Sequence, residues 1–426
     1  MSDRTTVIIG AGLPLNLDLP DGSFIPSTKN ITTEVCKPYP DYTQYLNNKN
    51  AKTNIVADFY DYLVQNYPIP NANNPYINFE DIFHCMEEYM SYSYAWNKSC
   101  INTDICPVFG PFTNPAILFD VNIISSVMKQ FLLRIMDVVN VYDQYFISEI
   151  NGREKWLNDF IKGLGIIDVF NFNYDTMIEN ILGNSNYTDG FIPTSVTTDY
   201  WVFSPEMIIN RPDDISTINH LHGCINLFHT QNPNSHVNEL RHEDWVQYPD
   251  YNTVRKKMVG TSQSQPHTQS GETIYNGPII TGLNKTAKLN CVPFDFYHAN
   301  LVNSITKNHK LLIIGYSFGD LYCNQLIQRM NLIHGDDARV CIIDYWGLND
   351  NYRHTFSDFA DNLKHDLGAT LCIYSNATMF SEAVVTMQPL DRNAMMKSPS
   401  NKLMLGINGL KSASTFANEI YLFLNS

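Results

Sequence analysis

Thr5-Thr6-Val7-Ile8-Ile9-Gly10-Ala11-Gly12 is a run of β-branched residues that passes directly into a glycine turn. Similar β-rich runs recur along the chain, at 166–172, 215–221, 278–281, 310–314, 340–344 and 370–374. Several lack in–out alternation, as is typical of strands buried on both faces of a parallel sheet. Segments with helical spacing lie between them, at 175–182, 296–307, 321–333 and 354–367. This alternation predicts an α/β fold with a Rossmann-like, doubly wound parallel sheet.

Residues 55–163 break this alternation. The segments with helical spacing in this region are 57–65, 79–93, 121–150 and 153–162, with no convincing strand between them. We therefore expect a large helical insertion in the sheet domain.

The expected domain division follows from this interruption. It consists of a discontinuous Rossmann-like domain at 1–54 and 164–380, the helical insertion at 55–163, and a short C-terminal extension at 381–426. The extension ends in a predicted amphipathic helix at 412–424 and is a candidate for oligomerisation. Two polar stretches, 184–214 and 230–276, are expected as long loops.

The composition excludes several classes of protein. The chain has 426 residues, 44% of them hydrophobic and 17% charged, which excludes a small disulfide-stapled scaffold. Its 28 Lys and Arg against 43 Asp and Glu give a net charge of −15, which repels phosphate backbones. We therefore expect no direct nucleic-acid binding, and any such recognition would belong to a partner.

The cysteines and the apolar stretches indicate a compartment. Nine cysteines are scattered along the chain without a CxxC pair, which is typical of reduced cytosolic thiols. The first residues lack the features of a signal peptide. A membrane span needs about 20 nearly uncharged residues, whereas the longest apolar stretch, 121–150, contains Lys129, Arg134, Asp137 and Asp143. We expect a cytoplasmic protein that does not associate with membranes.

Four short motifs follow predicted strands, and the first is Gly10-Ala11-Gly12. Glycines at such a turn let the backbone approach a pyrophosphate and present N–H groups to it. The motif lacks the third glycine of the common dinucleotide fingerprint and the acidic residue about 20 positions later. An ordinary tight turn is therefore an equally good interpretation.

The second motif, Asn171-Phe-Asn173-Tyr-Asp175, lies where a buried strand gives way to a helix. Asn173 can both donate and accept hydrogen bonds, which suits a ribose hydroxyl or a positioned water. Asp175 has two interpretations, a helix N-cap or a partner for a developing cation.

The third motif is His220-Leu-His222-Gly-Cys224. Two histidines two residues apart on a strand point to opposite faces and would not share a metal. His222, at the end of a short strand, is a candidate general base at neutral pH, and packing is the alternative for either histidine.

The fourth motif, Gly315-Tyr-Ser317-Phe318-Gly-Asp320, again ends a buried strand. Gly315 would allow a cofactor to approach closely, Ser317 could bond a phosphate or ribose oxygen, and Asp320 is placed to cap the next helix. After the next strand, Asp344 is either an adenosine-ribose contact or a plain surface aspartate.

In this order the four motifs resemble those of the sirtuin family, specifically its bacterial defence-associated branch. The matching sirtuin motifs, Gly-Ala-Gly, Gln-Asn-Ile-Asp, His-Gly and Gly-Thr-Ser, surround one NAD⁺ molecule. The resemblance covers about residues 5–380 and implies that Asn173 holds the nicotinamide ribose and that His222 is the catalytic base. The expected cofactor-binding residues are Gly10, Ala11, Gly12, Asp175, Gly315, Ser317, Phe318, Asp320 and Asp344. The segment Asn-Phe-Glu80-Asp81-Ile-Phe also looks like the start of the helical insert of this branch.

Departures from the protein-deacetylating sirtuins are equally informative. Those enzymes hold a structural zinc with two CxxC pairs, and this chain has neither pair, so we expect no metal. In place of the family's Gly-Ile-Pro-Asp-Phe-Arg segment it has Asn16-Leu-Asp-Leu-Pro20. Both differences disfavour deacetylation.

The resemblance therefore implies an NAD⁺ glycohydrolase, which releases nicotinamide and ADP-ribose and acts as an anti-phage effector by depleting cellular NAD⁺. The alternatives are a non-catalytic sensor that binds NAD or ADP-ribose, and an NAD-dependent protein deacylase. A homo-oligomer and an activating partner are expected, with a HerA-type ATPase the first candidate and a short Argonaute-type protein the second.

Overall fold

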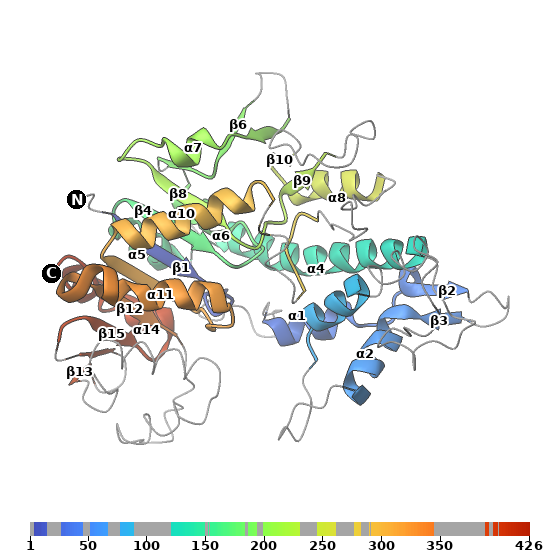
Figure 1. The fold of residues 1–426 in the computed structure, drawn as a ribbon, viewed down its shortest axis with the longest axis horizontal. Coiled ribbons are helices and arrows are strands. Elements are labelled where there is room, and N and C mark those ends of the chain that lie inside the picture. Colours follow the sequence, from blue (N-terminus) through green and yellow to red (C-terminus); the bar gives the residue numbers. More distant parts are fainter. Residues whose placement is uncertain are drawn as a thin grey trace.

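The computed structural model places the central strands side by side, with helices on both sides of them (Figure 1). The residues that it describes are 4–14, 27–45, 52–66, 77–88, 121–149, 152, 154–183, 186–193, 199–230, 245–260, 277–282, 289, 291–344, 388–391, 395–398 and 400–426. The predicted strand at 370–374 and the predicted helix at 354–367 lie outside the described residues.

The described residues form a central sheet of nine strands in the order β13-β14-β15-β12-β11-β1-β4-β8-β5. Their bounds are β1 Thr5–Ile9, β4 Ile167–Asn171, β5 Tyr187–Thr188, β8 Ser216–His220, β11 Lys310–Ile314, β12 Arg339–Ile343, β13 Gln388–Asp391, β14 Met395–Lys397 and β15 Leu403–Gly406. All pairs from β15 to β5 are parallel, and only the pairs of β14 with β13 and β15 are antiparallel. The predicted α/β fold with a Rossmann-like parallel sheet is confirmed.

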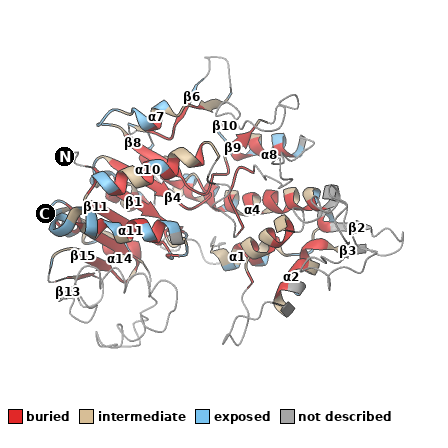
Figure 2. Cartoon of the chain, viewed as in Figure 1, coloured by how far each residue is buried: buried red, intermediate tan, exposed pale blue. Residues whose placement is uncertain are grey.

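Both faces of the sheet are covered, which explains the continuous apolar runs. All residues of β1, β4, β8 and β11 are buried, as Figure 2 shows. One face packs against α5 (Lys155–Gly163), α6 (Met177–Leu182), α14 (Gly409–Ser414) and α15 (Ala417–Leu424). The other face packs against α10 (Phe294–Lys307) and α11 (Leu321–His334).

The helical block centres on α4 (Val121–Glu149), which is 29 residues long. It packs against α1 (Thr28–Val35), α2 (Ile55–Asn66) and a helical segment at 79–88 in one apolar core. A small sheet of β2 (Thr43–Tyr45) and β3 (Lys52–Asn54) precedes α2. The block thus begins with α1, before residue 55, whereas α5 packs with the sheet core. None of the described helices combines the length and apolarity needed to cross a lipid bilayer.

The C-terminal segment differs from the expected extension at 381–426. β13, β14 and β15 lie in the main sheet, and β15 is parallel to β12. The predicted helix at 412–424 is two helices, α14 and α15, which pack on one sheet face. β15 was not predicted, because Leu403–Gly406 is too short to show a period.

The two stretches expected as loops contribute three strands to a second, antiparallel sheet. Its order is β6-β7-β10-β9, from β6 (Phe191–Pro193), β7 (Trp201–Phe203), β9 (Leu227–His229) and β10 (Trp245–Gln247). The fourth strand, β9, precedes the second stretch. Two helices, α7 (Glu206–Ile209) and α8 (Tyr251–Gly260), also lie in these stretches. The expected strand at 278–281 forms only an isolated bridge between Gly223 and Ile279.

Candidate active site

Four neighbouring strands bring the four motifs to one edge of the sheet. The order β11-β1-β4-β8 places the carboxyl ends of these strands side by side, and one motif follows each strand. Ligands of open α/β sheets bind at this edge. The motifs, far apart in sequence, are thus adjacent in space.

The first and fourth motifs touch backbone to backbone. The Gly10 N–H donates to the Ile314 carbonyl oxygen (3.0 Å), and the Gly12 N–H donates to the Gly315 carbonyl oxygen (2.7 Å). A Cβ on Gly10 would lie 2.6 Å from the Gly315 oxygen, and one on Gly12 would lie 2.6 Å from the Gly315 Cα. Gly315 itself has φ 57°. Close packing between the two turns therefore explains these glycines, and the two N–H groups expected to face a pyrophosphate are bonded within the protein.

Asn173 links the first and second motifs. Its Nδ2 donates to the Gly10 carbonyl oxygen (3.1 Å), and its backbone N–H donates to Asn171 Oδ1 (3.0 Å). The residue is 9% exposed and lines the pocket described below. Its side chain is therefore held at the pocket by the turn after β1, and its backbone is held by the end of β4.

Asp175 bonds the first residue of the helix that follows the second motif. Its Oδ1 accepts a hydrogen bond from the Met177 N–H at the start of α6 (3.1 Å). The side chain is buried, and burial together with the Asp143 carboxylate raises the pKa of Asp175 to about 7. The N-cap of α6 is Thr176, so Asp175 lies one residue before the cap, and it lines the pocket.

His222 joins the third and fourth motifs. Its Nε2 lies 3.7 Å from Asp320 Oδ2, and its ring meets Phe172 edge to face at 4.9 Å. The Ile280 N–H donates to the His222 carbonyl oxygen (2.7 Å), which fixes the turn. A histidine beside an orienting carboxylate has the arrangement of a general base. Asp320 also caps α11, as expected, by accepting from the Cys323 N–H (3.0 Å).

The other histidine of the motif points away, as predicted. His220 is fully buried, with Nε2 2.5 Å from Glu179 Oε1 on α6. Burial acts to lower the pKa of His220, but the neighbouring Cys224 and the Glu179 carboxylate raise it well above its ordinary value. His220 therefore forms a buried ion pair that ties the end of β8 to α6.

Glu179, His220 and Cys224 are also the residues that could hold a metal in the described part of the chain. Their ligand atoms lie within 4.8 Å of one another. Histidine, cysteine and carboxylate are ligands that zinc accepts. Here, however, His220 is bonded to Glu179, and the Cys224 thiol donates to the Asp175 carbonyl oxygen (3.4 Å). The expectation of no metal stays a prediction.

The remaining expected cofactor contacts lie at the same edge of the sheet. Phe318 has φ 55°, and its carbonyl oxygen accepts from Asn324 Nδ2 (2.7 Å). Ser317 is exposed. Asp344 follows β12, and its backbone bonds Gly406 and Gly409. Of the nine expected cofactor-binding residues, all of them among the described residues, Ala11 and Asp175 line the pocket and the other seven do not, and all nine contacts stay predictions.

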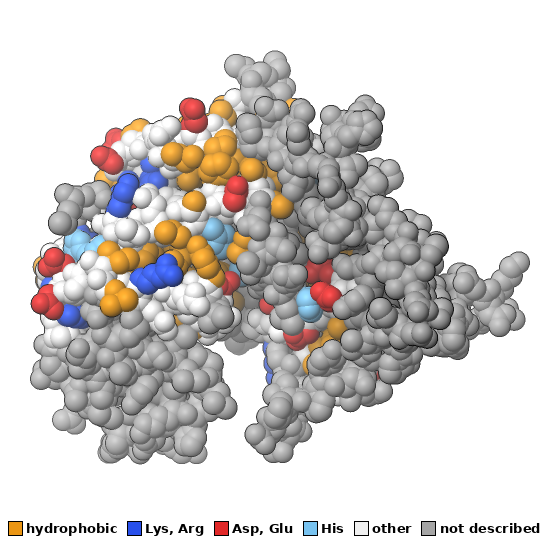
Figure 3. All heavy atoms as spheres, in the orientation of Figure 1, with side chains coloured by type: hydrophobic (Ala, Val, Ile, Leu, Met, Phe, Trp, Pro, Cys, Tyr) orange, Lys and Arg blue, Asp and Glu red, His pale blue; other side chains and the backbone are white. Residues whose placement is uncertain are grey.

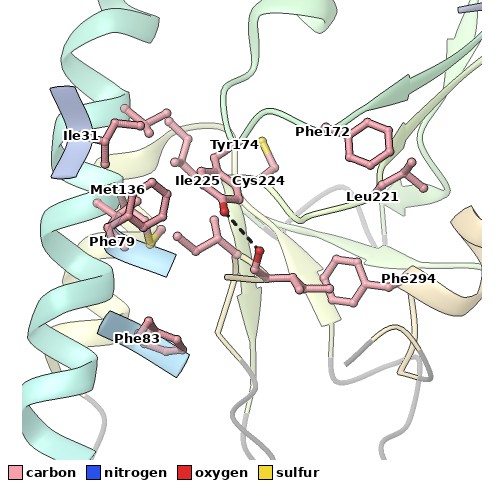
Figure 4. Packing of buried hydrophobic residues seen from close by; sticks show 14 of the residues in the cluster. Ile31, Phe79, Phe83, Met136, Phe172, Tyr174, Leu221, Cys224, Ile225 and Phe294 are labelled. Carbon is pink, nitrogen blue, oxygen red and sulfur yellow. Dashed lines mark hydrogen bonds between the residues drawn. The ribbon is translucent and has the colours of Figure 1, made fainter. Parts of the chain in front are cut away.

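An open cleft of about 530 Å³, a volume that includes the solvent at its mouth, brings together Asn173, Asp175 and His222. It is lined by Ala11, Pro14, Thr28, Ile31, Phe79, Glu80, Val139, Phe172, Asn173, Tyr174, Asp175 and His222. The motif residues come from the sheet edge, and the opposite wall comes from α1, the helix at 79–88 and α4. Figure 4 shows Phe79 and Ile31 on the side of α4, with Phe172 on the sheet side and Tyr174 between them. Most of this wall was not predicted from the sequence, in which only the segment around Glu80 stood out.

A doubly wound sheet with polar motifs at the strand ends around one pocket defines a Rossmann-like ligand-binding protein. A family model described as a SIR2-like domain matches residues 168–362, so this part of the chain is similar to SIR2-like domains. The match begins within β4 and includes the second, third and fourth motifs. No curated protein matches the chain. A SIR2-like domain supports an NAD-related function.

Proposed function

We propose that this protein is an NAD⁺ glycohydrolase. The observation that carries the proposal is the convergence of Asn173 and His222 on one pocket, with Asp320 Oδ2 3.7 Å from His222 Nε2. Binding alone requires neither an amide held at the pocket nor an oriented imidazole.

The reaction breaks the bond between the nicotinamide nitrogen and C1′ of the ribose. The bonding electrons leave with nicotinamide, whose nitrogen is already positive in the substrate and needs no proton. Water then bonds to C1′ and loses a proton to His222, giving ADP-ribose. Asn173 orients the ribose and the water, and Asp320 stabilises the protonated imidazole. General-base assistance of this kind contributes roughly 10²–10⁴-fold.

Following NAD⁺ loss in purified protein, with and without an acyl-lysine peptide, tests this proposal. Hydrolysis without peptide, lost in His222→Ala and Asn173→Ala, is the expected result. Nicotinamide release only with peptide would favour the deacylase. Tight NAD⁺ binding without turnover would favour the sensor.

We further propose a role as an anti-phage effector. Uncontrolled NAD⁺ consumption would harm the cell, so the activity has to stay off until infection switches it on. Exposed apolar side chains support association with another copy or an activating protein. Those on α11 are Tyr322, Leu332 and Ile333, and Figure 3 shows apolar side chains over α10 and α11. A HerA-type ATPase is the first candidate partner and a short Argonaute-type protein the second. Measuring cellular NAD⁺ during phage infection tests this role. A fall in NAD⁺ with wild type but not with His222→Ala is the expected result.

A further inference from the structure

Glu80 lies in the wall of the pocket, opposite the sheet, at the start of the helix over 79–88. The backbone that carries it is anchored twice. Asn78 Oδ1 accepts from the Glu80 N–H (2.8 Å), and the Phe79 N–H donates to Thr32 Oγ1 on α1 (3.0 Å). The position of Glu80 is therefore fixed by its helix cap and by the neighbouring helix.

Tyr174 connects Glu80 to the second motif. The Tyr174 hydroxyl lies 3.4 Å from Glu80 Oε1 and 3.2 Å from the Ile280 carbonyl oxygen. Burial and the Glu80 carboxylate raise the pKa of Tyr174 well above its ordinary value, so the hydroxyl stays a neutral donor. Glu80 therefore contacts the second motif through Tyr174, and it lines the same pocket as Asn173, whose amide is proposed to hold the ribose.

The pocket has an anionic character. Among the described residues that line it, none is Lys or Arg, and the acidic residues are Glu80 and Asp175, of which Asp175 has its pKa raised to about 7 by burial. The Asp175 carboxylate is engaged by the Met177 N–H and is more deeply buried, whereas Glu80 is partly exposed. A pocket of this charge suits the cationic end of a ligand.

We propose that Glu80 is a further catalytic residue, whose carboxylate contacts the cationic nicotinamide riboside part of NAD⁺ and stabilises the positive charge that develops on the ribose. The inference rests on the proposed glycohydrolase function. As the C1′–N bond breaks, the electron pair leaves with nicotinamide, water adds to C1′, and its proton passes to His222. Glu80 forms no bond and acts through its charge, which is worth most in a water-poor site.

Comparison of Glu80→Gln with wild type is the first test. The substitution keeps the size and hydrogen bonding of the side chain and removes its charge. We expect kcat to fall about 10²-fold, as for other groups that stabilise transition-state charge, and KM to rise about tenfold, because the charge pair with bound NAD⁺ is lost as well. Glu88→Gln, which makes the same change further along the same helix, is the matched control and should retain wild-type kcat. A wild-type kcat in Glu80→Gln would overturn the inference.

A second test measures binding without turnover. In a His222→Ala background, calorimetry compares NAD⁺ with ADP-ribose, which lacks the cationic ring. Adding Glu80→Gln should weaken NAD⁺ binding about tenfold, because a charge pair is lost, and leave ADP-ribose binding unchanged. Equal weakening of both ligands would indicate a purely structural role and overturn the inference.

The two proposals fail in different ways. If wild type leaves NAD⁺ intact, the glycohydrolase proposal is wrong, but the calorimetric comparison still decides whether Glu80 recognises the cationic end. If circular dichroism shows that Glu80→Gln does not fold, Glu80→Asp replaces it. The aspartate side chain is shorter, so its charge lies further from the ribose. A reduced kcat in Glu80→Asp therefore supports the inference, and a wild-type kcat overturns it.

Discussion

Replacing Asp175 by Asn should stabilise the protein, and increasingly so as the pH rises. The Asp175 carboxyl is buried, and burial with the nearby Asp143 carboxylate raises its pKa to about 7. Between the unfolded pKa and this value, the folded state holds a proton that the unfolded state has released. Stability therefore falls as the pH rises through this range. An asparagine amide oxygen can still accept the hydrogen bond from the Met177 N–H at the start of α6.

The magnitude follows from the difference between the folded and unfolded pKa values. With about 1.4 kcal/mol per unit, ionised Asp175 costs about 4 kcal/mol at pH 8, and part of this is already present at pH 5. We expect the stability advantage of Asp175→Asn over wild type to widen by about 3 kcal/mol between pH 5 and pH 8.

Urea unfolding at pH 5, 6, 7 and 8 and constant ionic strength measures this difference. Asp250→Asn is the matched control, because Asp250 also caps a helix, by accepting from the Thr253 N–H (3.0 Å), but is exposed. Its stability difference from wild type should change little with pH over this range. A difference in the free energy of unfolding between Asp175→Asn and wild type that stays constant with pH, or that becomes smaller toward pH 8, would refute the reasoning.

Three further predictions concern the neighbourhood of the pocket. Glu179→Gln leaves His220 as an uncompensated buried cation, so it should lower the free energy of unfolding by about 3–5 kcal/mol. A double variant that also carries His220→Leu should recover much of this loss, because the buried cation is then removed as well. Urea midpoints of both variants check it, and an unchanged midpoint in Glu179→Gln would contradict the ion pair. Gly12→Ala should cost about 1–3 kcal/mol by overpacking against Gly315, whereas Gly152→Ala, with its nearest neighbour at 3.5 Å, should cost little of this kind. Comparable melting temperatures for the two glycine variants would count against the backbone contact. Dialysis against EDTA should leave the melting temperature unchanged, and stoichiometric zinc by elemental analysis would instead show that the protein holds a metal.

The fold could be predicted from sequence where strands are long enough to show a pattern. β1, β4 and β11 are each five residues long, buried on both faces, and read as continuous apolar runs. β15 has four residues and β10 three, and such short segments become strands only because distant partners pair with them. Pairing of this kind leaves no local signal in the sequence.

The candidate site also has a part that could be predicted from the sequence and a part that could not. Asn173 and His222 follow buried strands directly, so the rule that ligands bind at strand ends predicts from the sequence that they meet. Ile31 and Val139 reach the pocket from helices, and their places depend on how those helices pack. The roles of Gly10 and Gly12 could not be predicted in this way, because a phosphate-binding turn and a close backbone contact use the same residues.

The turns after β1 and β11 lie far apart in the sequence but touch each other, so we expect their sequences to change together in evolution. Gly12 and Gly315 already touch. Replacing either glycine by a residue with a Cβ would therefore require the backbone of the other turn to move away. A chimaera that takes residues 4–14 from a related protein and keeps residues 310–320 from this one would join turns that have not been matched. Gene shuffling or loop grafting on this scaffold should therefore move both segments together, and Asn173, which bonds the Gly10 carbonyl oxygen, belongs with them.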